Sequence, residues 1–196
     1  ILGGDLDVSL IHRQLEGEER AFLDDQGRLS EIAEMRAMVR RPDTSDQTLV
    51  ELKAVDGAYP LYGTVALSTG EPLDAALADR DGQHTAVADV TLLARLGVDV
   101  GDVLALGRTQ VRVVGTIASE PDKLSGGVEF GPRLMMSSAA LADTGLVQPG
   151  SLVRWHYRIA GEDGSFSAAR IQKITDAANA GFPQAGWRIR SRTDAA

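Results

Sequence analysis

The amino-acid sequence predicts an α+β fold in which both ends of the chain build one subdomain and the middle builds a second, mostly β subdomain. Three observations predict it. Alternating apolar and polar residues, which indicate half-buried strands, occur near both ends of the chain. A stretch with helical periodicity follows each of these strands, and short strands and turns fill the region between. The expected division is residues 1–58 with 149–196, against inserted residues 59–148.

The first part of the chain predicts a strand followed by a helix. Residues 4–10 alternate, which places Leu6, Val8 and Leu10 on one face. Residues 15–26 carry acidic side chains early and a glycine just after their end, as expected for a surface helix.

Two further strands follow, joined by a turn. The periodicity of residues 30–41 fits both a helix and a strand, and we expect a strand in the second half. Residues 42–47 supply turn residues, and residues 48–56 alternate again. The segment 57–63, GAYPLYG, breaks the periodicity, because Pro60 restricts the residue before it to extended backbone. It is interpreted as a crossing between two subdomains.

The middle of the chain predicts short strands with small helices. A helix ends at Gly97, and residues 103–117 form two strands around a Gly-Arg-Thr-Gln turn. A glycine-rich loop then precedes a short strand at residues 133–137. Ser138 is placed to cap the short helix that follows.

The chain closes with strand, helix and strand once more. Residues 151–159 alternate, and His156 is expected to face solvent on the polar side. Residues 166–181 show one apolar helical face, and residues 186–191 predict a strand. The arginines here, interpreted as charges of a solvated strand face, are Arg188, Arg190 and Arg192.

Composition excludes several classes of protein. With 43% hydrophobic and 24% charged residues in 196, the chain is typical of a globular protein. A formal net charge of -8 opposes nucleic-acid binding, so no nucleic-acid partner is expected. Cysteine is absent, which rules out disulfides and thiolate chemistry. No apolar run is long enough to span a membrane, and a start at Ile1 without a signal-like stretch predicts a piece of a longer protein.

No catalytic or metal-binding constellation is recognisable. His12, His84 and His156 stand apart without a ligand-spaced partner, so we expect no metal site and no cofactor. The G-x-S-x-G and Walker patterns are absent, and a glycine-rich turn explains Ser125 without catalysis.

Two pairs of acidic residues could in principle do acid–base work, Asp5 with Asp7 and Asp24 with Asp25. We expect the first pair on the exposed face of a strand and the second at an exposed helix end. Solubility is therefore the preferred explanation, and the domain is predicted to be non-catalytic.

Six stretches carry a resemblance to a known family. They are GGDLDVSLIHR, MRAMV, LVELKAVDGAYPLYGTV, LARLGVDVGDVLALGRTQVRVVGTI, EPDK with GPRLMMS, and TGLVQPGSLV. Together, from residue 3 to about 160, they resemble the periplasmic domain of FtsX-like, MacB-type ABC transporter permeases. The resemblance is greatest to the lysophospholipase-associated, YbbAP-type branch, and LVELKAVDGAYPLYG is its most distinctive piece.

The resemblance implies a porter-like, ferredoxin-like split βαβ subdomain with an inserted mostly β subdomain, the MacB periplasmic core type. It implies a place at the periplasmic face of the inner membrane, between transmembrane helices outside this sequence. A separate cytoplasmic ABC ATPase would drive export or extraction of a lipid, lipoprotein or protein cargo by mechanical transmission. A homodimer in the full transporter is also implied.

Mechanical transmission needs a part that has two arrangements, and the segment 57–63 is the expected hinge. Its residues are Gly57, Tyr59, Pro60, Tyr62 and Gly63. In the alternative, Tyr59, Pro60 and Tyr62 merely fill the junction between subdomains. Both interpretations stay open.

A second functional interpretation is a passive periplasmic module that binds a lipid or a protein through its glycine-rich loop. Gly126 and Gly127 suit a mobile loop, and Leu124, Phe130 and Met135 would suit an apolar ligand if exposed. Ordinary packing explains each of the three apolar residues as well. A third interpretation, a periplasmic hydrolase, has no residue to support it.

Overall fold

The computed structural model describes residues 3–123 and 130–194. Within these ranges the helices are α1 (Gly17–Asp24), α2 (Leu73–Leu77), α3 (Val90–Leu96), α4 (Ser138–Thr144) and α5 (Ala168–Gly181). The strands are β1 (Leu6–Ile11), β2 (Arg28–Arg40), β3 (Gln47–Val55), β4 (Ala66–Leu67), β5 (His84–Ala88), β6 (Val103–Leu106), β7 (Thr109–Ser119), β8 (Arg133–Ser137), β9 (Arg154–Ala160) and β10 (Arg188–Ser191).

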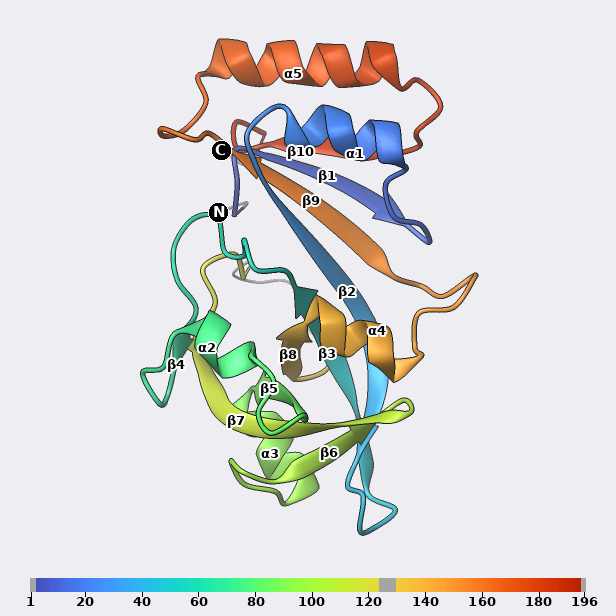
Figure 1. Ribbon diagram of the computed structural model, residues 1–196, viewed down its shortest axis with the longest axis vertical. Coiled ribbons are helices and arrows are strands. Elements are labelled where there is room, and N and C mark those ends of the chain that lie inside the picture. The colour runs from blue at the N-terminus through green and yellow to red at the C-terminus, as the bar shows by residue number, and fades with distance from the viewer. Residues whose placement is uncertain (1–2, 124–129, 195–196) are drawn as a thin grey trace.

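The strands join in one mixed sheet in the order β10-β1-β9-β2-β3-β8-β5-β7-β4, with β6 beside β2 and β7. Strands from the two ends of the chain therefore lie together at one end of the sheet, and α1 and α5 cover them there (Figure 1). The strands and helices from the middle of the chain lie at the other end (Figure 1). Whether these two groups are separate subdomains remains a prediction.

The helix-covered face at the first end is apolar, as the alternation predicted. Leu6 and Val8 of β1 lie opposite Ile159 and Tyr157 of β9. All four side chains are buried in one core with residues of both covering helices. Burying such side chains stabilises each strand by roughly 1.5–3 kcal/mol per residue, so this face fixes α1 and α5 on the sheet.

Strand β2 connects the two groups of strands. It is 13 residues long, and its first residues pair with β9 while Val39 and Arg40 pair with β6. Along Ile32 to Arg40 it also pairs with β3. The whole of β2 is a strand, so the helical alternative for residues 30–41 is wrong. The periodicity of this stretch fits both a helix and a strand, and pairing with neighbouring strands on both of its edges selects the strand.

Two helix boundaries follow from local chemistry. Helix α3 ends at Gly97, which adopts the left-handed conformation with φ 62°, as the sequence predicted. The cap of α4 is Ser137 rather than Ser138, because the Ser137 hydroxyl accepts a hydrogen bond from the Ala140 amide at 3.1 Å. Strand β8 runs directly into this helix, so its last residue takes the capping position.

The two ends of the described chain lie side by side (Figure 1). The Arg192 amide donates to the Asp5 carbonyl oxygen at 3.1 Å, just beyond the β1–β10 pairing of Leu6 with Ser191. Within residues 3–123 and 130–194, no helix has both the length and the apolar character needed to cross a membrane.

Candidate functional site

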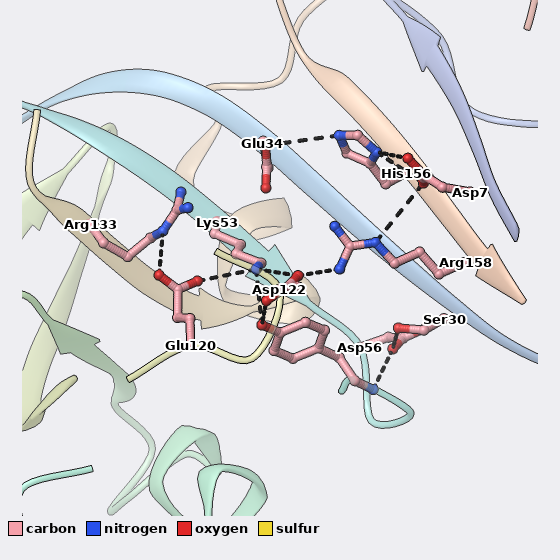
Figure 2. A network of polar contacts seen from close by, with 11 residues as sticks. Asp7, Ser30, Glu34, Lys53, Asp56, Glu120, Asp122, Arg133, His156 and Arg158 are labelled. Atoms are coloured by element: carbon pink, nitrogen blue, oxygen red, sulfur yellow. Dashed lines mark hydrogen bonds and ion pairs between the residues drawn. The ribbon is translucent and has the colours of Figure 1, made fainter. Parts of the chain in front are cut away.

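A group of charged and phenolic side chains meets where β3, β8 and β9 approach the segments that follow β3 and β7 (Figure 2). We call it the junction cluster, and it consists of Lys53, Tyr59, Glu120, Asp122, Arg133 and Arg158. All but Arg133 are buried residues, and the Arg133 side chain is only 15% exposed. Buried charges are rare unless they are paired, so the cluster is the feature of this chain that most needs explanation.

Lys53 is the centre of the junction cluster. Its place on β3 directs it away from the apolar core that contains Leu52 and Ala54. The ammonium group donates to Asp122 Oδ2 at 2.8 Å, to Glu120 Oε1 at 3.1 Å and to Tyr59 Oη at 2.9 Å. Three acceptors satisfy all three N–H groups of the lysine, which makes its burial tolerable.

Asp122 joins three other members of the cluster. One carboxylate oxygen contacts both Lys53 and Arg158, and the other accepts a hydrogen bond from Tyr59 Oη at 2.7 Å. Burial by itself would raise the pKa of Asp122, but Lys53 and Arg158 outweigh burial and hold the pKa well below its usual range. Asp122 is therefore ionised at neutral pH.

Tyr59 stays protonated, because its burial and its charged neighbours both raise the pKa of the phenol. Burial raises the pKa of its phenol, and the charges of Asp122 and Glu120 raise it further. The hydroxyl is thus a fixed donor to Asp122 and an acceptor for Lys53. The Lys53 ammonium also lies 4.6 Å from the centre of the tyrosine ring, within the range of a cation–π contact.

Arg133 and Arg158 complete the charge balance. Arg133 Nε donates to Glu120 Oε2 at 3.1 Å, and Arg158 Nε lies 4.0 Å from Asp7 Oδ1. Burial tends to lower the pKa of each guanidinium, but the neighbouring carboxylates raise it overall, so both stay charged. Three cations thus face the carboxylates of the cluster and Asp7.

The cluster ties distant parts of the chain together. The carboxylates, the ammonium group and the phenol are all engaged in ion pairs or hydrogen bonds, and the raised pKa of Tyr59 keeps its phenol protonated. Arg158 Nε is buried without a hydrogen bond, with Asp7 at 4.0 Å. Among the residues the structure describes, no three His, Asp or Glu side chains gather in a way that could hold a metal ion. What the arrangement can do is hold the segment 119–122 against β3 and β9.

The acidic pair at the start of β1 is buried, which corrects the prediction that it is exposed. Asp5 is 0% exposed, and its Oδ2 accepts hydrogen bonds from Tyr62 Oη at 2.9 Å and from the amides of Gly161 and Phe166. Asp7 is 4% exposed. The partners come from remote segments, which alternation within one strand does not reveal. Asp24 and Asp25 are exposed, as expected.

His156 is the other residue for which the prediction of a solvent-facing position is wrong. Its side chain is only 13% exposed, and Nδ1 lies 3.0 Å from Asp7. Its Nε2 lies 3.8 Å from Glu34 on the other side (Figure 2). The imidazole is held between carboxylates of β1 and β2, the two strands that flank β9.

The structure anchors the expected hinge by its two tyrosines. Tyr59 belongs to the junction cluster, and Tyr62 is bonded to Asp5. Pro60 follows a cis peptide bond. Gly63, with φ +75°, lies so close to Pro121 that a Cβ at this glycine would be 2.6 Å from the Pro121 Cβ, so only glycine fits. The fifth hinge residue, Gly57, has no such neighbour within 4 Å.

The expected interaction loop is only partly within the described residues. Leu124, Gly126 and Gly127 lie outside them. Phe130 is 57% exposed, and the Arg36 guanidinium lies 3.7 Å from the centre of its ring. Met135 is 0% exposed, so the expectation that it is available to a ligand is wrong. It lies on β8, between β3 and β5, and packs in an apolar core there.

Sequence reasoning missed the junction cluster. One signal was present: Lys53 and Arg158 each stand directly between two apolar residues of a strand. Glu120 and Asp122 flank a proline just after a long strand. Acidic residues are common in such turns at the surface, so the sequence gives no reason to expect these two to be buried. Their partners are 67 and 69 residues away in the chain, so spacing could not indicate the contact.

Comparison with known proteins gives one curated relative by sequence. The chain is 36% identical over 115 residues to an uncharacterized ABC transporter permease, YbbP, of Escherichia coli K12. The match covers 59% of this chain but spans only 13% of the length of that permease. No family model matches the chain.

Solved structures show the fold. The periplasmic region of MacB from Actinobacillus actinomycetemcomitans has a TM-score of 0.60 at 9% identity, covering 97% of this chain and 90% of its own. The extracellular domain of the noncanonic ABC-type transporter YknZ from Gram-positive bacteria has 0.58 at 11% identity, with 95% and 100% covered. A domain of a permease protein, described as putative, from Porphyromonas gingivalis has 0.56 at 9% identity, with 100% and 97% covered.

These likenesses confirm two predictions. The α+β class and the MacB-type periplasmic fold are both confirmed by the structures. The resemblance to FtsX-like, MacB-type permease domains is confirmed by the same structures together with the match to YbbP.

Proposed function

We propose that this chain is the periplasmic domain of an ABC transporter permease and that it passes motion from the membrane to a cargo. The observation that carries the proposal is the 36% identity to a permease over 115 residues, joined to a MacB-type fold. The placement of both chain ends side by side supports it, because a domain held between two membrane helices needs that geometry.

In this proposal the ATPase is a separate cytoplasmic protein, reached through membrane helices that lie outside the sequence. The domain itself carries out no reaction. Its cargo is a lipid, a lipoprotein or a protein that is exported or extracted from the inner membrane, and the working transporter contains two copies of the permease.

The junction cluster supplies a physical basis for transmission. Removing one partner from a buried ion pair costs about 3–5 kcal/mol, so such a network holds its segments in one arrangement until it opens as a whole. The cluster joins β9 from the end of the chain, β3 and the segment after β7. A displacement applied at the chain ends is therefore passed to the strands from the middle of the chain through the ion pairs of the junction cluster.

The expected hinge at residues 57–63 acts within this frame. Tyr59 and Tyr62 anchor it to Asp122 and Asp5. Bending at the hinge requires these two hydrogen bonds to break, which gives the domain two distinct arrangements, anchored and released. The competing interpretation, that the tyrosines only fill the junction, predicts no functional effect of preventing release.

An engineered disulfide separates the two interpretations. We expect Ala66→Cys with Ser119→Cys to form a bond under oxidising conditions, because these exposed residues lie directly opposite each other in the β4–β7 pairing and the chain has no other cysteine. The bond would hold the residues just after the hinge against the segment 119–122. In the full permease with its ATPase, reconstituted in membrane vesicles, oxidation should lower ATP turnover several-fold, and dithiothreitol should restore it.

The matched control is Arg40→Cys with Gln47→Cys, which are paired across the exposed β2–β3 hairpin. This bond crosslinks a single hairpin and should leave turnover unchanged. Equal turnover of the oxidised and reduced Ala66→Cys/Ser119→Cys transporter would contradict the mechanical part of the proposal. Failure of the permease to stimulate any ATPase would contradict the transporter assignment itself.

A further inference from the structure

A hollow of about 260 Å³ lies on the sheet face opposite α1 and α5, over β10, β1 and β9. Its lining is Asp7, Ser9, Ile11, Arg154, His156, Gly186, Arg188 and Arg190. A second hollow, of about 370 Å³, adjoins it and shares Ile11 and Arg154. Together they form one groove, which is basic over β10 and β9. Toward Leu152 it is partly apolar and is also lined by Arg36 and by the carboxylates of Glu34 and Glu51.

Three arginines of this groove have side chains without a hydrogen bond or ion pair among residues 3–123 and 130–194, namely Arg154, Arg188 and Arg190. Of these, Arg190 acts electrostatically on the carboxylate of Asp194. The nearby carboxylate of Asp7 is already engaged by His156 and Arg158. Unpaired guanidinium groups repel one another, so their gathering in a chain of net charge -8 creates a local site for an anion.

Strand register sets the arrangement of the groove. Ser9 lies opposite Arg188 on one side and opposite His156 on the other. Ile11 lies opposite Arg154 in the same way. The arginines thus stand on the two strands that flank β1, with a serine hydroxyl between them. Arginine forks and hydroxyl donors are the groups that bind phosphate oxygens most readily.

The position of the groove favours a membrane lipid over a soluble molecule as the source of the phosphate. Arg190 lies opposite Asp7, two residues along each strand from the hydrogen bond between Arg192 and Asp5 at which both chain ends meet. If the chain ends continue into the membrane, as the proposed function has it, the groove lies beside the membrane surface. Ile11 and Leu152, which are 52% and 75% exposed, lie at its other end, away from the chain ends.

We propose that this groove binds the phosphate headgroups of anionic phospholipids at the membrane surface, with Arg154, Arg188 and Arg190 as the ligating residues. The inference rests on the proposed function only for the source of the phosphate. It describes a contact that orients the domain on the bilayer, and it is separate from the transmission of motion through the junction cluster.

Vesicle sedimentation of the 196-residue chain tests the proposal. We expect binding to phosphatidylcholine vesicles that contain phosphatidylglycerol and none to phosphatidylcholine alone. The variant Arg154→Gln/Arg188→Gln/Arg190→Gln should bind on the order of 100-fold more weakly, since each basic residue near an anionic surface contributes roughly fivefold. The control Arg40→Gln/Arg95→Gln/Lys173→Gln has the same net charge but changes exposed residues elsewhere and should bind as the unchanged chain does.

Three results would overturn the proposal. Equal loss of binding in both triple variants would show a general charge effect with no site. No binding of the unchanged chain to anionic vesicles would exclude a headgroup site. Binding of inorganic phosphate, measured by calorimetry, without vesicle binding would assign the groove to a soluble phosphate. None of these results bears on the disulfide experiment, so the two proposals fail independently.

Discussion

The two faces of β1 and β9 are made of alternate residues of the same strands, yet they are buried by different physics. On one face, Val8 and Tyr157 lie under α1 and α5 in an apolar core. On the other, Asp7 and Arg158 are also buried, but through paired charges. Apolar burial has no preferred direction, whereas buried charges demand partners at fixed positions. The polar face therefore specifies where the segment 119–122 must lie, and the apolar face supplies the stabilisation.

Replacing Asp122 by asparagine tests the contribution of the polar face, and of the substitutions considered it should have the largest effect on the free energy of unfolding. The change leaves Lys53 and Arg158 buried without their shared anion, so the free energy of unfolding should fall by about 3–5 kcal/mol, measured by urea denaturation at neutral pH. The apolar counterpart, Ile159→Val, should cost only about 1 kcal/mol.

The same variant makes a prediction for pH. Because the pKa of Asp122 is lowered in the folded protein, its stabilisation is present above the ordinary aspartate pKa of 3.8 and is lost as the pH falls below it. The difference between the unchanged protein and Asp122→Asn should shrink in acid. A difference below about 0.5 kcal/mol at neutral pH, the size typical of a surface substitution, would show that the polar face does not specify the fold.

Tyr59→Phe sharpens the comparison within the polar face. It keeps the ring but removes the hydroxyl that bridges Lys53 and Asp122, which should cost about 2 kcal/mol in urea denaturation. Tyr62→Phe removes one of three donors to Asp5 from a less buried tyrosine, and should cost less. Equal losses would mean that burial in the cluster adds nothing to a tyrosine hydrogen bond.

An exposed polar contact gives the smallest expected effect. His84 lies between Asp79, at 2.7 Å from Nδ1, and Asp143, at 2.6 Å from Nε2. Hydrogen bonds to Asp143 and Asp79 raise its pKa, so the stabilisation is complete below the ordinary value of 6.5 and is lost as the pH rises through the raised pKa. Because both carboxylates are exposed, we expect about 0.5 kcal/mol.

The measurement for His84 compares the free energy of unfolding of the unchanged protein and of His84→Gln. The difference should be present just below pH 6.5 and absent at about pH 9. Asp143→Asn should remove part of the same pH dependence, whereas Asp163→Asn, in an exposed turn, should not. A difference that grows toward high pH would contradict the assignment.

Local patterns were sufficient to predict most elements of this fold. Alternation identified β1, β3 and β9, and Gly97 marked the end of α3, because these features depend on near neighbours in the chain. The pairing of β2 with both β9 and β6 could not be predicted in the same way. It depends on strands more than 60 residues away, whose register no local pattern contains.

The candidate site was less accessible from sequence than the fold. Asp5, Asp7 and His156 were assigned to solvent because polar residues of an alternating strand usually face water. Their burial depends on Tyr62, Arg158 and Glu34, which belong to other segments. Met135 shows the converse error, since an apolar residue near a glycine-rich loop turned out to lie on a central strand.

The meeting of the chain ends has a mechanical consequence. Strand β1 starts and β10 ends at the same end of their antiparallel pair. A load that draws the two ends apart therefore falls first on the bond between the Arg192 amide and the Asp5 carbonyl, and then peels the pair open one rung at a time. A load that displaces both ends in the same direction is shared by the whole sheet. The β1–β10 pairing thus resists a shared displacement of both ends better than their separation, and under the proposed function any helices that continue from the two ends would move together.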